Sequence, residues 1–270
     1  MINSTHGVRP PAVAGAFYPG NPEQLAHDVD ALLAHAVDHH VRPKALIVPH
    51  AGYIYSGPIA ASAYAAVAAM RPRPTKVVLL GPSHHVGFKG LALPGVEALE
   101  TPLGLVEVDA ELVERMRAFP FVGESPLAHK REHSLEVQLP FLQRALRSFT
   151  VLPLVVGLAA PQDVARVLDA VWGGPETLIV VSSDLSHYLP FEQARAVDAR
   201  TAARIGALDA AGLASEQACG VEPVRGLLVA ARAHHLTAQL LDLRNSGETA
   251  GDRLRVVGYG AFAFSPPERT

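Results

Sequence analysis

Histidine follows three separate apolar runs of this sequence, and neutral imidazole is a common protein ligand for iron, zinc and copper. His50 follows Ala45-Leu-Ile-Val, His84 follows Val77-Val-Leu-Leu, and His187 follows Leu178-Ile-Val-Val. Each run suits a buried strand, and each histidine lies in a turn shortly after its end. In open α/β sheets, ligands bind beyond the carboxyl ends of the strands. If the three strands are parallel neighbours, their histidines converge on one site.

The turns after the first two runs predict a metal site, because His50 and His84 occupy matching positions in successive strand-loop units. For the remaining ligand the sequence offers Cys219, Glu222, Asp184 and His187. Cys219 lies where a loop enters a helix, and a helix N-terminus lowers the pKa of a thiol toward the thiolate that binds metal. Mixed histidine and cysteine sets bind zinc or copper, whereas two histidines with Glu222 would form the ligand set of non-heme iron oxygenases. The sequence alone does not separate these sets.

Acid–base chemistry is predicted beside this site. His187 is a candidate general acid or base, and Asp184, in the same loop, is its orienting partner or an outer-shell group. His133 stands at a predicted helix start and is a further candidate for a catalytic role in the pocket. The substrate pocket is predicted to be lined by Tyr53, Tyr55, His85 and Glu222. A serine hydrolase is disfavoured because no Gly-x-Ser-x-Gly turn is present.

Helices must alternate with strands to hold these turns in place. Apolar spacing and capping residues predict helices over 21–36, 58–70, 109–119, 135–147 with an interruption at Pro140, 161–172, 190–205 and 219–234. Further strands are predicted over 149–157, 236–243 and 254–264, with short antiparallel strands within 86–108. The pattern predicts an α/β fold, with a largely parallel or mixed central sheet covered by helices on both faces. Residues 1–270 are predicted to form a single domain that starts with an extended lead-in segment, residues 1–20.

Composition excludes several classes of protein. Apolar residues make up 49% of the chain and charged residues 18%, which is typical of a globular protein. A net charge of −3 without a basic cluster argues against nucleic-acid binding. No apolar run approaches the roughly 18 residues that span a membrane, and signal-peptide features are absent, so a cytoplasmic protein is expected. The single cysteine, Cys219, excludes an internal disulfide.

Four motifs follow one another in the order Pro49-His-Ala-Gly-Tyr53, Gly81-Pro-Ser-His-His85, Glu132-His-Ser-Leu-Glu136 and Val181-Ser-Ser-Asp-Leu-Ser-His187. Together they resemble the Memo family, also called AmmeMemoRadiSam system protein B. The resemblance extends nearly from end to end, from residues 14–19 to residues 257–260. It implies a fold similar to that of class III extradiol dioxygenases, which hold Fe(II) with two histidines and a carboxylate. For prokaryotic members it also implies an AMMECR-type protein and a radical SAM protein as partners.

The resemblance further implies a ligand set of His50, His84 and Cys219 for iron or copper, with Asp184 and His187 in the acid–base position. Two features depart from the family pattern. Val221-Glu-Pro follows Cys219-Gly where animal members carry Arg-His-Pro, so Glu222 is placed to reshape the pocket or to compete as a ligand. The lead-in segment also lacks the histidine that animal members carry just before Ala-Gly.

Three functions follow from these observations. The first is a metal-dependent redox enzyme, dioxygenase-like, that uses Fe(II) or copper and dioxygen on a small-molecule substrate. The second is a non-catalytic module in which a former dioxygenase cleft holds a metal ion or a peptide. The third is a zinc-dependent hydrolase that uses a metal-activated water. Neither the substrate, nor the native metal, nor the oligomeric state is determined by the sequence.

Overall fold

The structure, a computed structural model, describes residues 7–267. The strands are β1 (Val8–Arg9), β2 (Ala45–Val48), β3 (Lys76–Pro82), β4 (Leu91–Leu93), β5 (Ala98–Thr101), β6 (Gly104–Glu107), β7 (Val122–Glu124), β8 (Thr150–Val156), β9 (Thr177–Ser182), β10 (His187–Leu189), β11 (Thr237–Asn245) and β12 (Val256–Ser265). The helices are α1 (Pro22–His35), α2 (Tyr53–Ala69), α3 (Ala110–Met116), α4 (Pro126–Lys130), α5 (Leu139–Leu146), α6 (Pro161–Ala170), α7 (Phe191–Gly206), α8 (Val221–Ala233) and α9 (Ser246–Thr249), with 3-10 turns η1 (Glu136–Gln138) and η2 (Ser215–Gln217).

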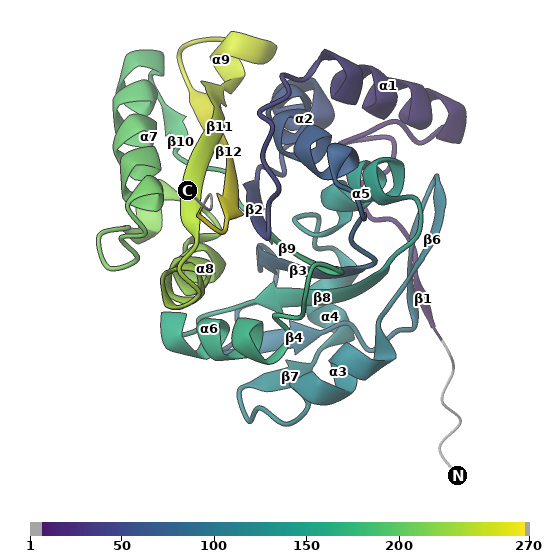
Figure 1. Ribbon diagram of the computed structural model, residues 1–270. Helices are drawn as coiled ribbons and strands as arrows, with labels where there is room; N and C mark the ends of the chain where they lie inside the picture. Colours follow the sequence, from purple (N-terminus) through teal and green to yellow (C-terminus); the bar gives the residue numbers. More distant parts are fainter. Residues whose placement is uncertain (1–6, 268–270) are drawn as a thin grey trace.

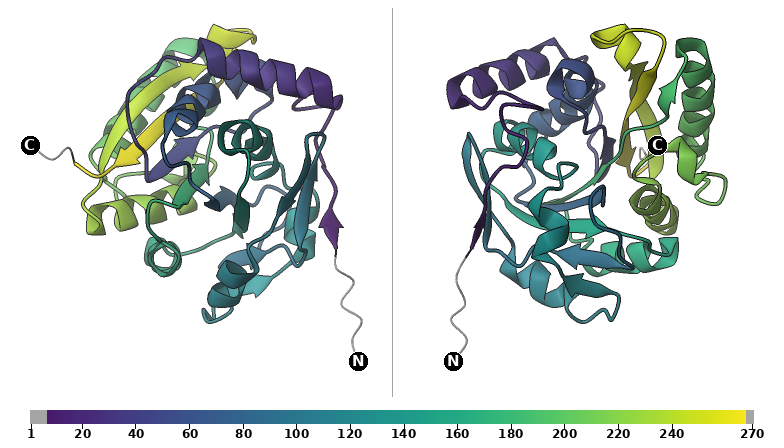
Figure 2. Two further views of the ribbon diagram at one scale, coloured as in Figure 1. Left: turned by 45° about the vertical axis from the view of Figure 1, so that its right-hand side comes forward. Right: turned by 180° about the vertical axis from the view of Figure 1, so that it is seen from behind.

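A nine-stranded mixed sheet runs through the molecule in the order β10-β12-β2-β9-β3-β8-β4-β7, with β11 paired to β12 (Figure 1). The strands β2, β9, β3 and β8 are parallel, and antiparallel strands flank them on both sides. Helices lie on both sides of this sheet (Figure 2). The predicted α/β fold with a mixed central sheet is therefore confirmed.

The three strands that precede the histidines are adjacent and parallel, as predicted. In register, Leu46 of β2 lies beside Val180 of β9, which lies beside Leu79 of β3. These three side chains belong to the apolar cluster under α1, α2 and α5, whereas the next residue of each strand belongs to the cluster under α6 and α8. Both faces of these strands are thus buried, which explains their continuous apolar sequence. Their carboxyl ends meet at one edge of the sheet.

Local capping signals in the sequence were good guides to helix boundaries. The side chain of Asn21 accepts a hydrogen bond from the amide of Gln24 at the start of α1, and Asp109 does the same for Leu112 at the start of α3. The predicted interruption at Pro140 is also confirmed, because η1 ends there and α5 restarts with Pro140 in its first turn.

Helix α2 begins at Tyr53, earlier than the predicted start at Pro58, so the prediction was wrong here. Its first amide is satisfied from outside the helix, because the Phe17 carbonyl accepts a hydrogen bond of 2.7 Å from the Tyr53 amide. Pro58 therefore lies inside the helix, at a cost of about 3 kcal/mol. Complete burial of Ile59 and Tyr64 in the core offsets that cost. No helix within residues 7–267 combines the length and apolar character needed to cross a bilayer.

A buried ion pair fixes the described part of the lead-in segment, residues 7–20. The Arg9 guanidinium donates to Glu136 at 2.8 Å and to the carbonyls of His129 and Glu132 at 2.7 and 2.6 Å. The Glu136 carboxylate also accepts hydrogen bonds from Tyr18 and from two amides of the segment. Because every one of these polar groups is paired, the segment can cross the core surface without leaving a buried charge unsatisfied.

We expect His129 to make the stability of the protein depend on pH. This histidine is buried and donates from Nε2 to the Ala92 carbonyl, and burial lowers its pKa to about 4. Below about pH 6.5 the His129 imidazole is protonated in the unfolded chain but stays neutral in the folded protein. The free energy of unfolding therefore falls as the pH drops from about 6.5 to about 4. The contribution reaches about 3 kcal/mol. Urea denaturation at several pH values should show a smaller decline for His129→Gln, and an equal decline would contradict this role.

Candidate metal centre

Three imidazoles meet beyond the carboxyl ends of β2 and β3. One nitrogen from each of His50, His84 and His133 lies within 4.8 Å of the others, the geometry of a candidate metal site. The ring centroids of His84 and His133 are 4.6 Å apart, and those of His50 and His84 are 5.1 Å apart. His50 is buried, whereas the His84 side chain is 27% exposed, so the cluster opens to solvent on one side. The sequence placed His133 in the pocket as a catalytic candidate, and the structure puts its ring beside the two expected ligands.

Cys219 adjoins this cluster at His50. Its sulfur lies 3.2 Å from His50 Nε2 and accepts a hydrogen bond of 3.3 Å from the Asp184 amide. Burial, together with the nearby Asp184 carboxyl, raises the pKa of the Cys219 thiol above its usual value. The expectation that the helix N-terminus would lower this pKa was wrong, because loss of hydration outweighs the helix dipole at this depth. The Cys219 thiol is therefore harder to ionise than an ordinary cysteine.

Glu132 orients His84, a role that sequence reasoning missed. One carboxylate oxygen lies 2.8 Å from His84 Nδ1, and the other accepts the His84 amide at 2.6 Å. Although burial opposes ionisation, these bonds and the amide of Ser134 hold the pKa of Glu132 well below its usual range. Carboxylate-to-histidine bonds of this kind fix ring orientation in metal sites. The signal was available in the motif Glu132-His-Ser-Leu-Glu136, but nothing in it indicates which distant histidine the carboxylate meets.

His50 is held by both its backbone and its ring. The Asp184 carboxylate accepts the His50 amide at 2.7 Å, and His50 Nδ1 lies 2.8 Å from the hydroxyl of Ser182. Burial lowers the pKa of His50 well below its usual value, and the neighbouring imidazoles lower it further. A neutral ring is the form that binds metal. Burial likewise lowers the pKa of His133, to about 4.

Asp184 lies in the loop after β9 and His187 begins β10, and no hydrogen bond joins the two side chains among the described residues. His187 Nδ1 bonds the Leu185 carbonyl at 2.8 Å instead, and burial lowers the pKa of His187. Burial raises the pKa of Asp184 to about 7, against the lowering effect of the His50 amide. A carboxyl group with a pKa of about 7 and an imidazole with a lowered pKa therefore stand beside the imidazole cluster.

The four predicted pocket residues occupy different places. Tyr53 is buried in α2, where its hydroxyl donates to the Val137 carbonyl, and Tyr55 lies exposed on the first turn of that helix. His85 is exposed, with its ring centroid 6.3 Å from that of His133. Glu222 and Cys219 line a cavity of about 540 Å³. Glu222 therefore lines the same cavity as the Cys219 thiol and not the same cavity as Tyr53.

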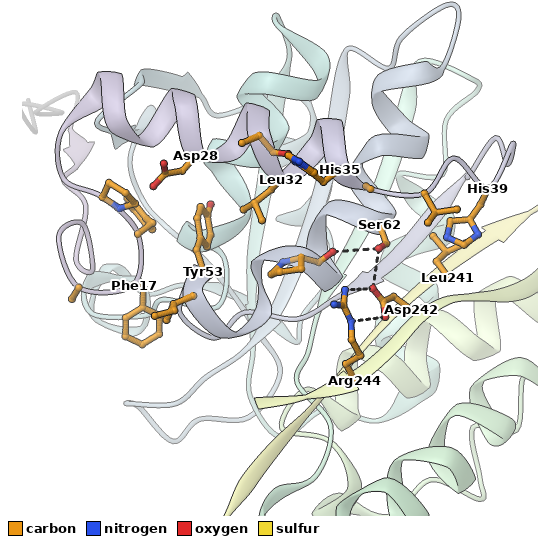
Figure 3. Close-up of a pocket in the computed structure, with 18 of the residues that line it drawn as sticks. Phe17, Asp28, Leu32, His35, His39, Tyr53, Ser62, Leu241, Asp242 and Arg244 are labelled. Atoms are coloured by element: carbon orange, nitrogen blue, oxygen red, sulfur yellow. Dashed lines mark hydrogen bonds and ion pairs between the residues drawn. The ribbon is translucent and has the colours of Figure 1, made fainter. Parts of the chain in front are cut away.

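A larger cavity, of about 1060 Å³, lies between the lead-in segment, α1, α2 and β11 (Figure 3). Phe17 lines this cavity, and its ring centroid is 4.8 Å from that of His133. Tyr53 and Leu32 contribute to the walls, and Asp242 and Arg244, paired through two hydrogen bonds, close one end. The cavity is mostly apolar with a few polar groups, as is usual for small-molecule sites. The Phe17 ring thus contacts both the cavity and the cluster.

Strand β3 has no room for a side chain at Gly81, three residues before His84. A Cβ atom there would lie 2.6 Å from Ser134 Oγ and 2.9 Å from a methyl group of Leu135. We expect Gly81→Ala to destabilise the protein by about 1–3 kcal/mol, because the clash pushes away the segment that carries Glu132 and His133. Gly87→Ala, in the loop that follows β3, is the matched control, because no atom lies within 4 Å of its added Cβ. Equal denaturation midpoints for the two variants would refute the tight packing at Gly81.

Comparison with known proteins places the chain in a family. A sequence profile described as Memo-like protein matches residues 9–263. A MEMO1 family protein of Aquifex aeolicus is 41% identical over 268 residues, which is 95% of this chain and 99% of that relative, and one from Methanopyrus kandleri is 36% identical, over 95% and 98%. A crystal structure of an uncharacterized protein from Escherichia coli K12 shares the fold, with a TM-score of 0.50 and 15% identity over 81% of this chain and 99% of that chain. The chain belongs to the Memo family.

Proposed function

We propose that this protein is a metal-dependent redox enzyme that oxidises a small molecule with dioxygen. The observation that carries the proposal is the imidazole cluster of His50, His84 and His133, with the thiol of Cys219 against one of its nitrogens. Two of the three rings have their Nδ1 atoms engaged by Ser182 and Glu132, which leaves the other nitrogen of each ring for an ion. Such outer hydrogen bonds accompany metal-binding histidines almost without exception.

The donor set suits a transition metal. Ligands bound at about 2.1 Å from one ion lie about 3.4 Å apart in a tetrahedral arrangement, so the three nitrogens, which lie within 4.8 Å of one another, would draw together by up to about 1.4 Å around an ion. Imidazole binds iron, copper and zinc alike, and a sulfur ligand favours zinc and copper over magnesium or calcium. When bound, iron or copper would supply the one-electron chemistry that dioxygen needs. His50 and His84 would hold the ion, with His133 or Cys219 as the third ligand.

The chain's own residues would position the substrate and move protons. Asp184, whose pKa is about 7, and His187, whose Nε2 is not used in any hydrogen bond of the described residues, stand beside the cluster as proton donor and acceptor. The cavity behind Phe17 would bind the apolar body of a small substrate and exclude water from it. The exposed side of His84 leaves access to the ion from solvent.

Metal binding tests the first half of the proposal. Protein purified without oxygen or chelators should contain iron or copper, and His50→Ala and His84→Ala should weaken its binding by at least about a hundredfold, since a ligand matters more than its outer partner. His85→Ala, the exposed neighbour, should keep the metal. Mass spectrometry of the metal content and chelator competition measure both. Of Cys219→Ser and His133→Ala, the variant that binds the metal more weakly identifies the third ligand. Unchanged metal content in the His50 and His84 variants would refute the site.

Oxygen uptake tests the second half. With catechol-like and other small reducing substrates, the metal-loaded protein should consume dioxygen, and His187→Ala should lower the rate by about a hundredfold or more while keeping the metal. His27→Ala, exposed on α1, serves as the control. Uptake that is equal in the two variants would remove His187 from the chemistry. Absence of uptake with every substrate, in protein that retains its metal, would favour the non-catalytic metal- or peptide-binding module.

A zinc-dependent hydrolase is the second candidate, and the three-histidine cluster with an open side favours it. Three imidazoles and a water are a frequent catalytic zinc set. Zinc would lower the pKa of that water to about 7, and Asp184 would accept its proton. Zinc in the anaerobically purified protein, together with ester hydrolysis that does not depend on oxygen, would select this function over the redox enzyme.

A further inference from the structure

Ser182, the last residue of β9, lies completely buried against three polar partners. Its hydroxyl donates to the Ser134 carbonyl at 2.6 Å, accepts from Gln138 Nε2 at 2.8 Å, and lies 2.8 Å from His50 Nδ1. A hydroxyl has one proton to donate and two lone pairs to accept with. Three partners therefore use all of its capacity, and their chemistry determines which way each bond runs.

The direction of each bond follows from its partner. The Ser134 carbonyl can only accept, so the single proton of Ser182 goes there. The amide of Gln138 is oriented by groups behind it: its Nε2 donates to the Pro49 carbonyl at 3.0 Å, and its Oε1 accepts from the Tyr64 hydroxyl at 2.9 Å. Reversing that amide would place an oxygen against a carbonyl oxygen. Gln138 must therefore donate to Ser182, and one lone pair of the hydroxyl remains.

That lone pair faces His50 Nδ1, which can complete the bond only as a donor. We infer that Ser182, supported by Gln138 and Tyr64, is a positioning residue that holds His50 as the Nδ1–H tautomer and aims the bare Nε2 at the cluster. The same nitrogen faces the sulfur of Cys219 at 3.2 Å. The purpose of this arrangement rests on the proposed metal site, but the tautomer itself does not.

The neighbouring rings of His84 and His187 are held in the same tautomer, but by acceptors of a different kind. His84 Nδ1 faces the Glu132 carboxylate, and His187 Nδ1 faces the Leu185 carbonyl, and neither acceptor can donate. The rings of His50, His84 and His187 therefore all carry the proton on Nδ1 and leave Nε2 without one. Of these three rings, only that of His50 has a hydroxyl as its acceptor, and a hydroxyl could instead donate its proton to Nδ1. The buried amide of Gln138 and the Ser134 carbonyl remove that freedom, because reversal would leave the carbonyl without its donor.

The ¹⁵N NMR spectrum of the histidine rings tests the inference directly, in metal-free protein. In the wild-type protein, His50 should show a protonated Nδ1 and an unprotonated Nε2. Ser182→Ala should shift His50 to a mixture of tautomers or to Nε2–H, and should weaken metal binding by about tenfold to a hundredfold. Thr201→Val is the matched control, because it removes a buried hydroxyl whose one bond to residues 7–267 goes to the Val197 carbonyl within α7. This variant should change neither the ring spectrum nor metal binding.

Two outcomes would overturn the inference: an Nε2–H tautomer in wild-type protein, or an unchanged ring spectrum in folded Ser182→Ala. The wild-type spectrum decides the question even if that variant does not fold. Ser182→Thr keeps the hydroxyl and should therefore keep the wild-type tautomer of His50. If Ser182 served only to fill space, the threonine variant would have no reason to differ from the alanine variant in the His50 tautomer. If the tautomer responds as stated but wild-type protein binds no metal, the proposed function fails and the positioning role of Ser182 stands.

Discussion

The structure depends on a short segment whose buried polar side chains must all find partners. Glu132, Ser134, Glu136 and Gln138 alternate with His133, Leu135 and Val137, and each of the four is almost completely buried. Leaving any one of these groups without a hydrogen bond would cost about 1–3 kcal/mol, more for a charge. The partners lie in three distant parts of the chain: His84 for Glu132 and the end of β3 for Ser134, Arg9 for Glu136, and Ser182 for Gln138. Satisfying this one segment therefore brings the strand ends and the lead-in segment together around the histidines.

Two carboxyl groups near the cluster have opposite tendencies, and the difference comes from their surroundings. Glu132 accepts bonds from two amides and an imidazole, so its pKa lies well below the usual range and it stays ionised. Asp184 is buried with fewer donors, and its pKa rises to about 7. Divergent environments of this kind separate a fixed charge from a group that exchanges protons. Glu132 suits the support of a ligand, and Asp184 suits proton transfer.

Much of this site was predictable because its first two histidines depend on local sequence. A buried strand that ends in a glycine-containing turn identifies His50 and His84, and the parallel order of β2, β9 and β3 follows from alternating elements. His133 was harder to place as a metal-site residue because it reaches the cluster from a segment with no strand before it. The predicted start of α2 and the predicted direction of the Cys219 pKa shift were wrong for a common reason. Both depend on distant parts of the chain: the Phe17 carbonyl satisfies the first amide of the helix, and burial of the thiol, together with the Asp184 carboxyl, raises its pKa.

The attachment of the lead-in segment also has a consequence for the order of folding. Arg9 and its partner Glu136 are separated by 127 positions in the chain. During synthesis the N-terminal residues leave the ribosome first, yet Arg9 has no partner until the segment around position 136 has followed. Phe17, which covers His133, belongs to the same early-made stretch. This segment can thus reach its place only after the chain around position 136 has been made, and Phe17 can pack against His133 no earlier than that.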